Sequence, residues 1–444
     1  MNRRKFIKQS SIVSLGFLTL SRCMQRSAIG SEEVLALVKD PNGYLDLPEG
    51  FSYKVISRLG DPMKDGLLVP GRPDGMGTFL REDGKVIIIR NHENSVEPEI
   101  NSAFGKQGAM LNSVEPNQVY DFGKGEYPGL GGTTTMIYDE EKNEVVEEFM
   151  SLAGTYRNCA GGVTPWNSWL TCEEDVSTQS NGDHIEKEHG YVFEIPASAT
   201  GLVDPKPIKD MGRFNHEAVT VDPETSIVYQ TEDRGDGLIY RFIPNDKNNL
   251  HEGGKLQVLA VKDQPSLDTR NWEEKLVQVG QKLEVQWMDI DDVTSPEDDL
   301  RYRGFDMGAA RFARGEGMWL GNGEVFFACT NGGPNKFGQV FRYDLAANTV
   351  ELYLESEDKS LLHMCDNLTI SPLGMMVLCE DNSKLNHMRY LSKDGELKTL
   401  AVNKSSKSEL TGSVFSPSGK TLFVNVQENG ETLAITGPWE QLWS

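Results

Sequence analysis

The sequence predicts an all-β fold, a β-propeller of five or six blades with loop insertions. The first observation is a recurring unit of two short apolar strands joined by a turn, with polar residues at both open ends. The second is a content of 44 glycines and 20 prolines without a periodic low-complexity tract, which is typical of many short strands. The third is that a helical period is hard to find after the first thirty residues.

The clearest copy of this unit is HEAVTVDPETSIVYQTEDR. Residues 218–221 and 227–230 alternate like strands, and DPETS between them has the composition of a turn. Glu217 precedes the first strand, while Glu232 and Asp233 follow the second. Because the two open ends of an antiparallel hairpin are neighbours, we expect these acids to lie at one edge.

Further copies share the same order of apolar strands and polar ends: NCAGGVTPWNSWLTCEED, RGEGMWLGNGEVFFACTNGG, CDNLTISPLGMMVLCEDN, FLREDGKVIIIRNHEN and GSVFSPSGKTLFVNVQEN. Five or six such units around one axis would bring all their open ends together, as the blades of a propeller do. A β-sandwich is the alternative architecture, but it would not gather these ends at one point.

No linker separates the copies, so we expect a signal segment over residues 1–30 and a single propeller domain over residues 31–444. Within that domain, residues 60–73, 97–124 and 245–299 are expected to be mostly insertions.

The first thirty residues combine a basic start, including Arg3 and Arg4, with a short apolar run from Ile12 to Leu20. This pattern predicts an export signal of the twin-arginine type, and therefore the twin-arginine machinery as a partner. The expected location is periplasmic or extracellular. A membrane anchor would require lipidation of Cys23, although an arginine stands before it where a small residue is expected.

The formal net charge of −23, without a basic block beyond the N-terminus, argues against a nucleic-acid partner. Carboxylates gathered at the shared edge would repel one another unless cations lie between them. Oxygen ligands suit Ca²⁺, and a thiolate suits iron or zinc. The candidate ligands are Cys159, Glu93, Glu173, Glu217, Glu232, Asp233, Glu316 and Asp366.

Each of these residue types also has a common role without a metal. Acids at strand ends are commonly just solvated, and a cysteine such as Cys159 is commonly a buried apolar residue. Cys159 is also placed to form a disulfide with Cys172 across its hairpin. The acidic stretch from Trp287 to Leu300 is a second candidate calcium loop, although it lacks the EF-hand pattern.

Several stretches resemble the PhoX-type alkaline phosphatases: NHEN, NCAGGVTPWNSWLTCEE, GRFNHEAVTVDP, VYQTEDRGDGLIYRF, WMDIDDV, GAARFARGEGMWLGNGEVFFACTNGG and CDNLTISPLGMMVLCEDN. The resemblance implies a six-bladed propeller and a phosphomonoesterase with iron (Fe³⁺) and calcium (Ca²⁺). It implies Cys159 and Glu217 at the iron, a phosphate-binding Arg314, and Glu316 as a metal ligand. The remaining candidates would mostly bind calcium: Glu93, Glu173, Glu232, Asp233 and Asp366.

This assignment agrees with elementary chemistry. Cations would reverse the local sign for a phosphate dianion and supply a metal-bound oxide or hydroxide as nucleophile. Arg314 would hold two phosphate oxygens at once. The resemblance thus implies a catalytic set of Arg314, Cys159 and Glu217, and we expect the protein to be a monomer. The alternatives are a calcium-dependent lactonase, a non-catalytic calcium-binding propeller and a structural propeller with solvated acids.

Overall fold

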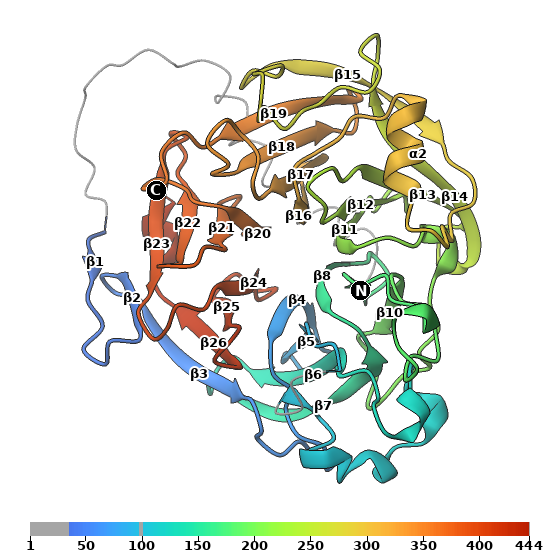
Figure 1. Cartoon of the computed structure of the whole chain (residues 1–444). Coiled ribbons are helices and arrows are strands. Elements are labelled where there is room, and N and C mark those ends of the chain that lie inside the picture. Colours follow the sequence, from blue (N-terminus) through green and yellow to red (C-terminus); the bar gives the residue numbers. More distant parts are fainter. Residues whose placement is uncertain (1–34, 97–100, 444) are drawn as a thin grey trace.

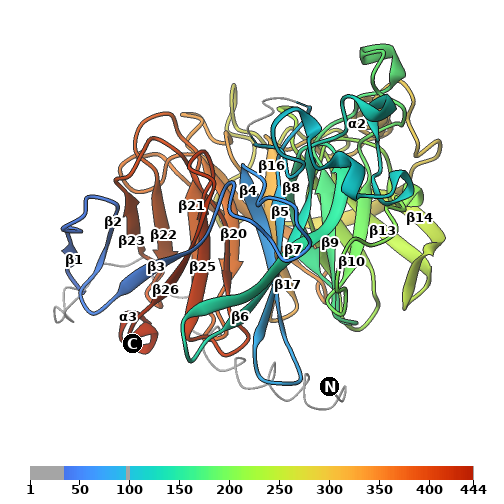
Figure 2. The ribbon, with the colours of Figure 1, turned by 90° about the horizontal axis from the view of Figure 1, so that it is seen from below.

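A computed structural model describes residues 35–96 and 101–443. Five β-sheets stand around one central axis in a propeller-like arrangement, with one short strand of each hairpin nearest the centre (Figure 1). Seen from the side, the sheets are packed next to one another around this axis (Figure 2). The predicted all-β, propeller-like fold is thus confirmed, while the number of six blades stays a prediction because two hairpins share one sheet.

Three sheets hold three or four strands each. Their members, in order of pairing, are β4 (Pro73–Leu80), β5 (Val86–His92), β6 (Gly131–Asp139) and β7 (Glu144–Thr155); β8 (Asn158–Val163), β9 (Ser168–Glu173) and β10 (Val192–Pro196); and β24 (Leu410–Phe415), β25 (Thr421–Val426), β26 (Glu431–Thr436) and β3 (Ser52–Arg58). The last sheet joins strands from both ends of the chain, because β26 pairs antiparallel with β3.

Two larger sheets complete the ring. One contains β20 (Cys365–Ile370), β21 (Met376–Glu380), β22 (His387–Leu391), β23 (Leu397–Asn403), β2 (Leu45–Pro48) and β1 (Leu37–Val38). The other contains β11 (His216–Val221), β12 (Val228–Glu232), β13 (Ile239–Asp246), β14 (Asn249–Val261), β15 (Lys282–Asp289), β19 (Thr349–Glu355), β18 (Gln339–Asp344), β17 (Glu324–Cys329) and β16 (Gly315–Gly321). In this sheet β15 pairs with both β14 and β19, which links two hairpin systems.

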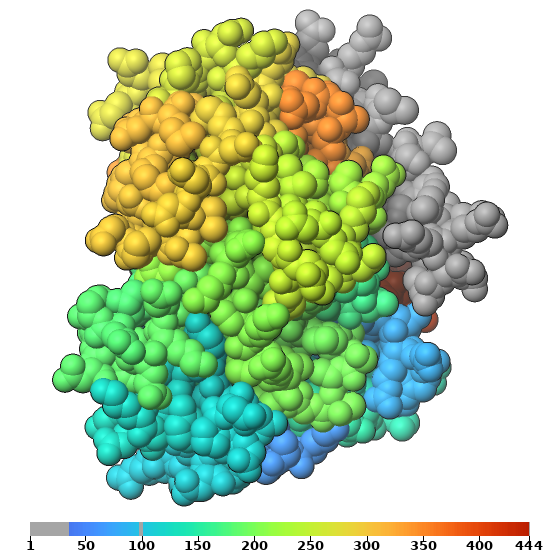
Figure 3. All heavy atoms as spheres, turned by 90° about the vertical axis from the view of Figure 1, so that its right-hand side faces the viewer, coloured from blue at the N-terminus to red at the C-terminus, as the bar shows by residue number. Residues whose placement is uncertain are grey.

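Helical segments are short and lie in the connections. They are η4 (Lys106–Gly108), η5 (Leu111–Ser113), η6 (Pro116–Gln118), η7 (Gly123–Gly125), η8 (Gln179–Asn181), η9 (Lys209–Met211), α2 (Leu300–Met307) and α3 (Trp439–Leu442). In Figure 3 the segment after β5 (cyan) and the α2 region (orange) lie along the left side of the molecule. Within the two described ranges, every helix is too short or too polar to cross a lipid bilayer.

The expected insertion over residues 245–299 needs correction, because it contains two long strands, β14 and β15. The twin-arginine signal and Cys23 lie outside the described residues.

All six inner strands share one irregularity near their start. In each of them the pairing register with the next strand shifts two or three residues into the strand: β4, β8, β11, β16, β20 and β24. Such a bulge leaves one residue unpaired and redirects its side chain. Because the bulge recurs at the same position, it gives the six hairpins equivalent inner ends.

Apolar side chains fill the wedges between neighbouring sheets, and one charged pair is buried among them. Arg90 on β5 is completely buried, and its guanidinium donates to Glu148 Oε1 at 2.8 Å. It also donates to the hydroxyl groups of Ser57 and Thr432, which belong to the neighbouring sheet. Arg90 therefore ties the first hairpin to the sheet that joins the two chain ends.

We predict that Arg90→Leu lowers the free energy of unfolding by about 3–5 kcal/mol, because it leaves the Glu148 carboxylate buried without its cation. Chemical denaturation measures this loss. The matched control is Arg81→Leu in the turn between β4 and β5, whose exposed pair with Asp83 is screened by water. The denaturation midpoint of the control should stay near that of the wild type, and equal midpoints for both variants would contradict the prediction.

Candidate metal centre

The bulge of the inner strands places one side chain per hairpin toward the axis. This residue directly follows the residue of the inner strand that is still paired just before the bulge. In five hairpins it carries a carboxylate or a thiol: Asp74, Cys159, Glu217, Glu316 and Asp366. In β24 the corresponding residue is Gly412, which follows the pair of Thr411 with Asn425. These equivalent positions explain how residues far apart in sequence meet.

Glycines beside these residues let the inner strands approach closely. A Cβ added at Gly75 would lie 2.6 Å from Ala160 Cα, and one added at Gly317 would lie 2.7 Å from the Leu368 backbone nitrogen. Only glycine fits such contacts without displacing the neighbouring backbone. The glycines that follow Asp74 and Glu316 thus bring neighbouring ligand positions together.

The second strand of each hairpin contributes the residue that follows it. The backbone N–H of this residue donates to a backbone carbonyl on the inner strand's side of the hairpin. The acceptor lies two positions before the residue at the bulge. The bonds are Glu93 to Arg72 at 2.9 Å, Glu174 to Arg157 at 2.9 Å, Asp233 to Asn215 at 3.1 Å, Thr330 to Arg314 at 3.0 Å and Asp381 to Met364 at 2.9 Å. Four of these five residues are acids, so this repeated bond fixes a second set of carboxylates beside the first.

Members of the two sets, together with Glu409, form four overlapping groups, which we call the acidic arc. In each group one potential ligand atom of every member lies within 4.8 Å of the others: Asp74, Glu93 and Cys159; Cys159, Glu174 and Glu217; Glu217, Glu316 and Asp366; and Asp366, Asp381 and Glu409. Neighbouring groups share Cys159, Glu217 or Asp366. The arc could therefore hold several cations side by side.

Mutual repulsion and burial resist ionisation of the arc. Burial, followed by the neighbouring carboxylates, raises the pKa of Glu217 and of Glu316 well above the usual range. The same causes raise the pKa of Glu174 to about 8 and that of Asp366 to about 7. Burial and the flanking Glu93 also raise the pKa of the Cys159 thiol. Multivalent cations would remove this penalty, so the donor set fits metal binding.

Three arginines border the arc at equivalent positions. Arg72, Arg157 and Arg314 each precede an inner strand and adopt positive φ angles of 45°, 46° and 51°. Arg72 and Arg157 both pair with Glu93, at 2.5 and 2.7 Å. Arg314 donates twice to Asp233, at 2.9 and 3.1 Å, and once to Glu316 at 2.6 Å. Their guanidinium groups balance part of the negative charge.

Of the eight metal ligands expected from the sequence, five lie in the acidic arc: Cys159, Glu217, Glu316, Glu93 and Asp366. Asp233 lies beside it, with both oxygens bonded to Arg314. Glu173 and Glu232 are in none of the four groups. Arg314, expected to contact phosphate, lies at the arc between Asp233 and Glu316.

Glu173 and Glu232 are the last residues of their strands, one position before the residues that border the axis. Because side chains alternate along a strand, they point away from their neighbours Glu174 and Asp233. Glu173 accepts bonds from His189 Nδ1 at 2.6 Å and from the Tyr156 backbone N–H at 2.9 Å. Glu232 accepts from the Tyr240 hydroxyl at 2.9 Å. Both carboxylates are thus used by the hairpins themselves.

Four members of the arc were not expected from the sequence: Asp74, Glu174, Asp381 and Glu409. Three of them stand at positions that the repeated unit contains, so an alignment of the six hairpins would have pointed to them. Glu409 precedes β24, in the copy of the unit with the fewest potential metal ligands at its ends. The sequence around Glu409 therefore does not mark it as a ligand.

Cys159 and Cys172 do not form the disulfide that their hairpin would allow. Both are buried free cysteines. Cys172 packs in an apolar cluster behind the hairpin, whereas the Cys159 sulfur lies 3.1 Å from Glu174 Oε2. Among the described residues, the stretch from Trp287 to Leu300 contributes to no group of three potential metal ligands. It therefore gains no support as a calcium loop.

Comparisons with known proteins identify a family and similar solved structures. The family model described as Alkaline phosphatase PhoX matches residues 33–430, and no curated protein matches. Among solved structures, the chain is similar to Pseudomonas fluorescens PhoX in complex with vanadate, with TM-score 0.65 and 19% identity over 91% of this chain and 97% of that chain. A Xanthomonas campestris gluconolactonase gives TM-score 0.42 and 12% identity over 94% of this chain and 100% of that chain.

The similarity to the solved PhoX structure supports the propeller-like fold, and the match to the family model shows the family. That model spans most of the chain and contains every residue of the acidic arc. The chain therefore belongs to the PhoX family of alkaline phosphatases, which hydrolyse phosphomonoesters.

Proposed function

We propose that this alkaline phosphatase works at the acidic arc, with iron (Fe³⁺) and calcium (Ca²⁺) as its cations. The observation that carries the proposal is a thiol inside a continuous row of buried carboxylates: Cys159 belongs to two of the four groups. Sulfur favours iron over calcium, while the sites made of carboxylates alone favour calcium. Cys159 and Glu217 would hold the iron, and Glu316, Glu93 and Asp366 would be further ligands.

The same observation separates this function from its rivals. A calcium-dependent lactonase or a calcium-presenting module would need oxygen ligands and no thiolate. A structural propeller with solvated acids would not bury its carboxylates, whereas Glu217 and Glu316 are each only 3% exposed. Glu173, Glu232 and Asp233 stay proposed ligands, although none of them belongs to the four groups.

Bound cations would polarise the phosphoryl oxygens and activate water as the nucleophile. The chain's own contribution is orientation. Arg314 is 27% exposed on its side chain, so it reaches the arc and the solvent at once. If Asp233 and Glu316 held cations, the planar guanidinium of Arg314 would be available to two phosphate oxygens. Arg314 would thereby align the ester for attack.

Transport fits the same proposal. We infer export through the twin-arginine machinery, which accepts folded proteins, of a single domain over residues 31–444. The substrates would be phosphomonoesters outside the cytoplasm, and membrane attachment would depend on Cys23.

The first prediction concerns activity. Protein exported by its own host should release phosphate from 4-nitrophenyl phosphate at alkaline pH, and a chelator should abolish this release because it removes the cations. Phosphate release and elemental analysis, made on the same sample, measure both effects. Activity that survives complete removal of iron and calcium would contradict the proposed metal centre.

The second prediction concerns the thiol. Cys159→Ala should lose iron and activity while keeping its fold, because the variant removes the sulfur ligand alone. The matched control is Cys172→Ala in the same hairpin, whose sulfur packs in the apolar core and should leave the iron content unchanged. Elemental analysis and circular dichroism give the result. Full iron content in Cys159→Ala would exclude this residue as a ligand.

The third prediction concerns the guanidinium. Arg314→Lys should lower kcat/KM by about tenfold or more and weaken inhibition by vanadate, because a lysine cannot donate to two oxygens in parallel. Steady-state kinetics with and without vanadate measure both. Arg342→Lys is the control, since Arg342 pairs with Glu324 and Glu351 away from the arc. Equal kinetics for the two variants would refute the role of Arg314.

A further inference from the structure

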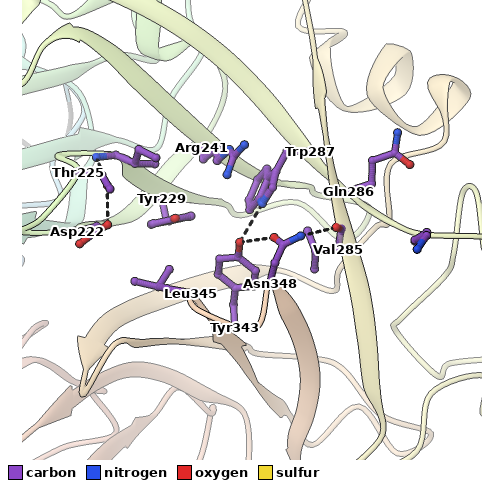
Figure 4. A pocket seen from close by; sticks show the side chains of 12 residues that line it. Asp222, Thr225, Tyr229, Arg241, Val285, Gln286, Trp287, Tyr343, Leu345 and Asn348 are labelled. Atoms are coloured by element: carbon purple, nitrogen blue, oxygen red, sulfur yellow. Dashed lines mark hydrogen bonds between the residues drawn. The ribbon is translucent and has the colours of Figure 1, made fainter.

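A pocket of about 670 Å³ lies away from the acidic arc, where the two hairpin systems joined by β15 meet (Figure 4). It includes Asp222 and Thr225, in the turn at the far end of the hairpin that carries Glu217. Five residues of extended strand separate Asp222 from Glu217, on the order of 15 Å. The pocket has the size typical of small-molecule sites and plays no part in the proposed phosphatase chemistry.

Three aromatic rings form the wall of this pocket: Tyr229, Trp287 and Tyr343. Their centroids lie 5.6–5.9 Å apart. A chain of hydrogen bonds fixes Trp287 and Tyr343. Trp287 Nε1 donates to the Tyr343 hydroxyl at 3.0 Å, which donates to Asn348 Oδ1 at 2.7 Å (Figure 4). Asn348 donates in turn to the Val285 carbonyl at 2.7 Å. The rings of Trp287 and Tyr343 are therefore held in place without a ligand.

Arg241 adds a positive charge that has no carboxylate within 4.0 Å among the described residues, while Asp289 acts on it electrostatically from farther away. Its guanidinium lies over the Trp287 ring at 4.6 Å, and its Nε donates to Gln257 at 2.7 Å. Of the arginines that the structure describes, only Arg213 and Arg241 have no carboxylate within 4.0 Å. Arg213 donates to the backbone carbonyls of Ser295 and Val176 instead.

The other charged side chains of the pocket are already used. Lys262 Nζ pairs with Glu284 at 2.8 Å. Asp222 accepts bonds from the Glu224 backbone N–H at 3.0 Å and from the Thr225 hydroxyl at 2.5 Å. Asp222 keeps its negative charge because both donors are neutral, and among the cations of the pocket Arg241 is the one without a carboxylate within 4.0 Å. In a chain of net charge −23, an arginine without an acidic partner is unusual.

We propose that this pocket binds a small planar organic anion of the aromatic carboxylate class. The carboxylate would accept two parallel hydrogen bonds from Arg241, and the ring would pack against Trp287 and the two tyrosines. Binding of this anion does not depend on the proposed phosphatase mechanism.

The probe is 2-naphthoate, titrated by calorimetry into the full exported protein, with neutral 2-naphthamide as its uncharged counterpart. We expect 2-naphthoate to bind with a dissociation constant below about 1 mM and 2-naphthamide at least about tenfold more weakly, because the amide cannot pair with the guanidinium. Absence of heat with 2-naphthoate at about 10 mM, or equal affinities for both probes, would overturn the proposal.

Two variants locate the binding. Arg241→Gln should weaken the binding of 2-naphthoate about tenfold or more, whereas Lys262→Gln in the same pocket should change this affinity little. Both should keep phosphatase activity, so a failure here is separate from a failure of the metal centre. Unchanged binding in Arg241→Gln would overturn the proposal. If that variant does not fold, the comparison of the two probes on the wild type still decides the question.

Discussion

Repulsion between buried carboxylates is the constraint that the central part of this molecule must satisfy. No apolar contact would draw Glu217, Glu316 and Asp366 together, yet their oxygens lie within 4.8 Å of one another. The folded ring of hairpins imposes this proximity, and the pKa values of these groups rise as a result. Protonation and the bordering arginines reduce this repulsion, and bound cations would reduce it further.

Alternation along the strands gives each hairpin end two chemical faces. One face meets the axis, and the other meets the sheet behind it, where His92, Glu173, Glu232 and Glu380 are buried. The side chains on this second face form hydrogen bonds within the sheet. Glu380, for example, accepts from Arg389 at 2.9 Å and bonds to His387 at 2.7 Å. Acids that stand next to each other in sequence thus serve separate purposes, one orienting the hairpin and the other facing the arc.

Much of this arrangement could be predicted from the sequence, because strand and turn patterns are local. The hairpins, their converging ends and the place of Cys159 all follow from the repeated unit. The exact register does not, since one bulge decides whether Glu173 or Glu174 meets the axis. The strand β15 could not be predicted for a similar reason: its pairing with both β14 and β19 depends on partners distant in sequence.

Closure of the ring by β3 and β26 sets an order of events during synthesis. Gln427, close to the last strand, donates to both Asp74 and Glu93, which lie more than 300 positions earlier. A ribosome must therefore release nearly the whole polypeptide before the first hairpin acquires its final neighbours. Any cation bound by the acidic arc would therefore enter after nearly the whole chain has been made.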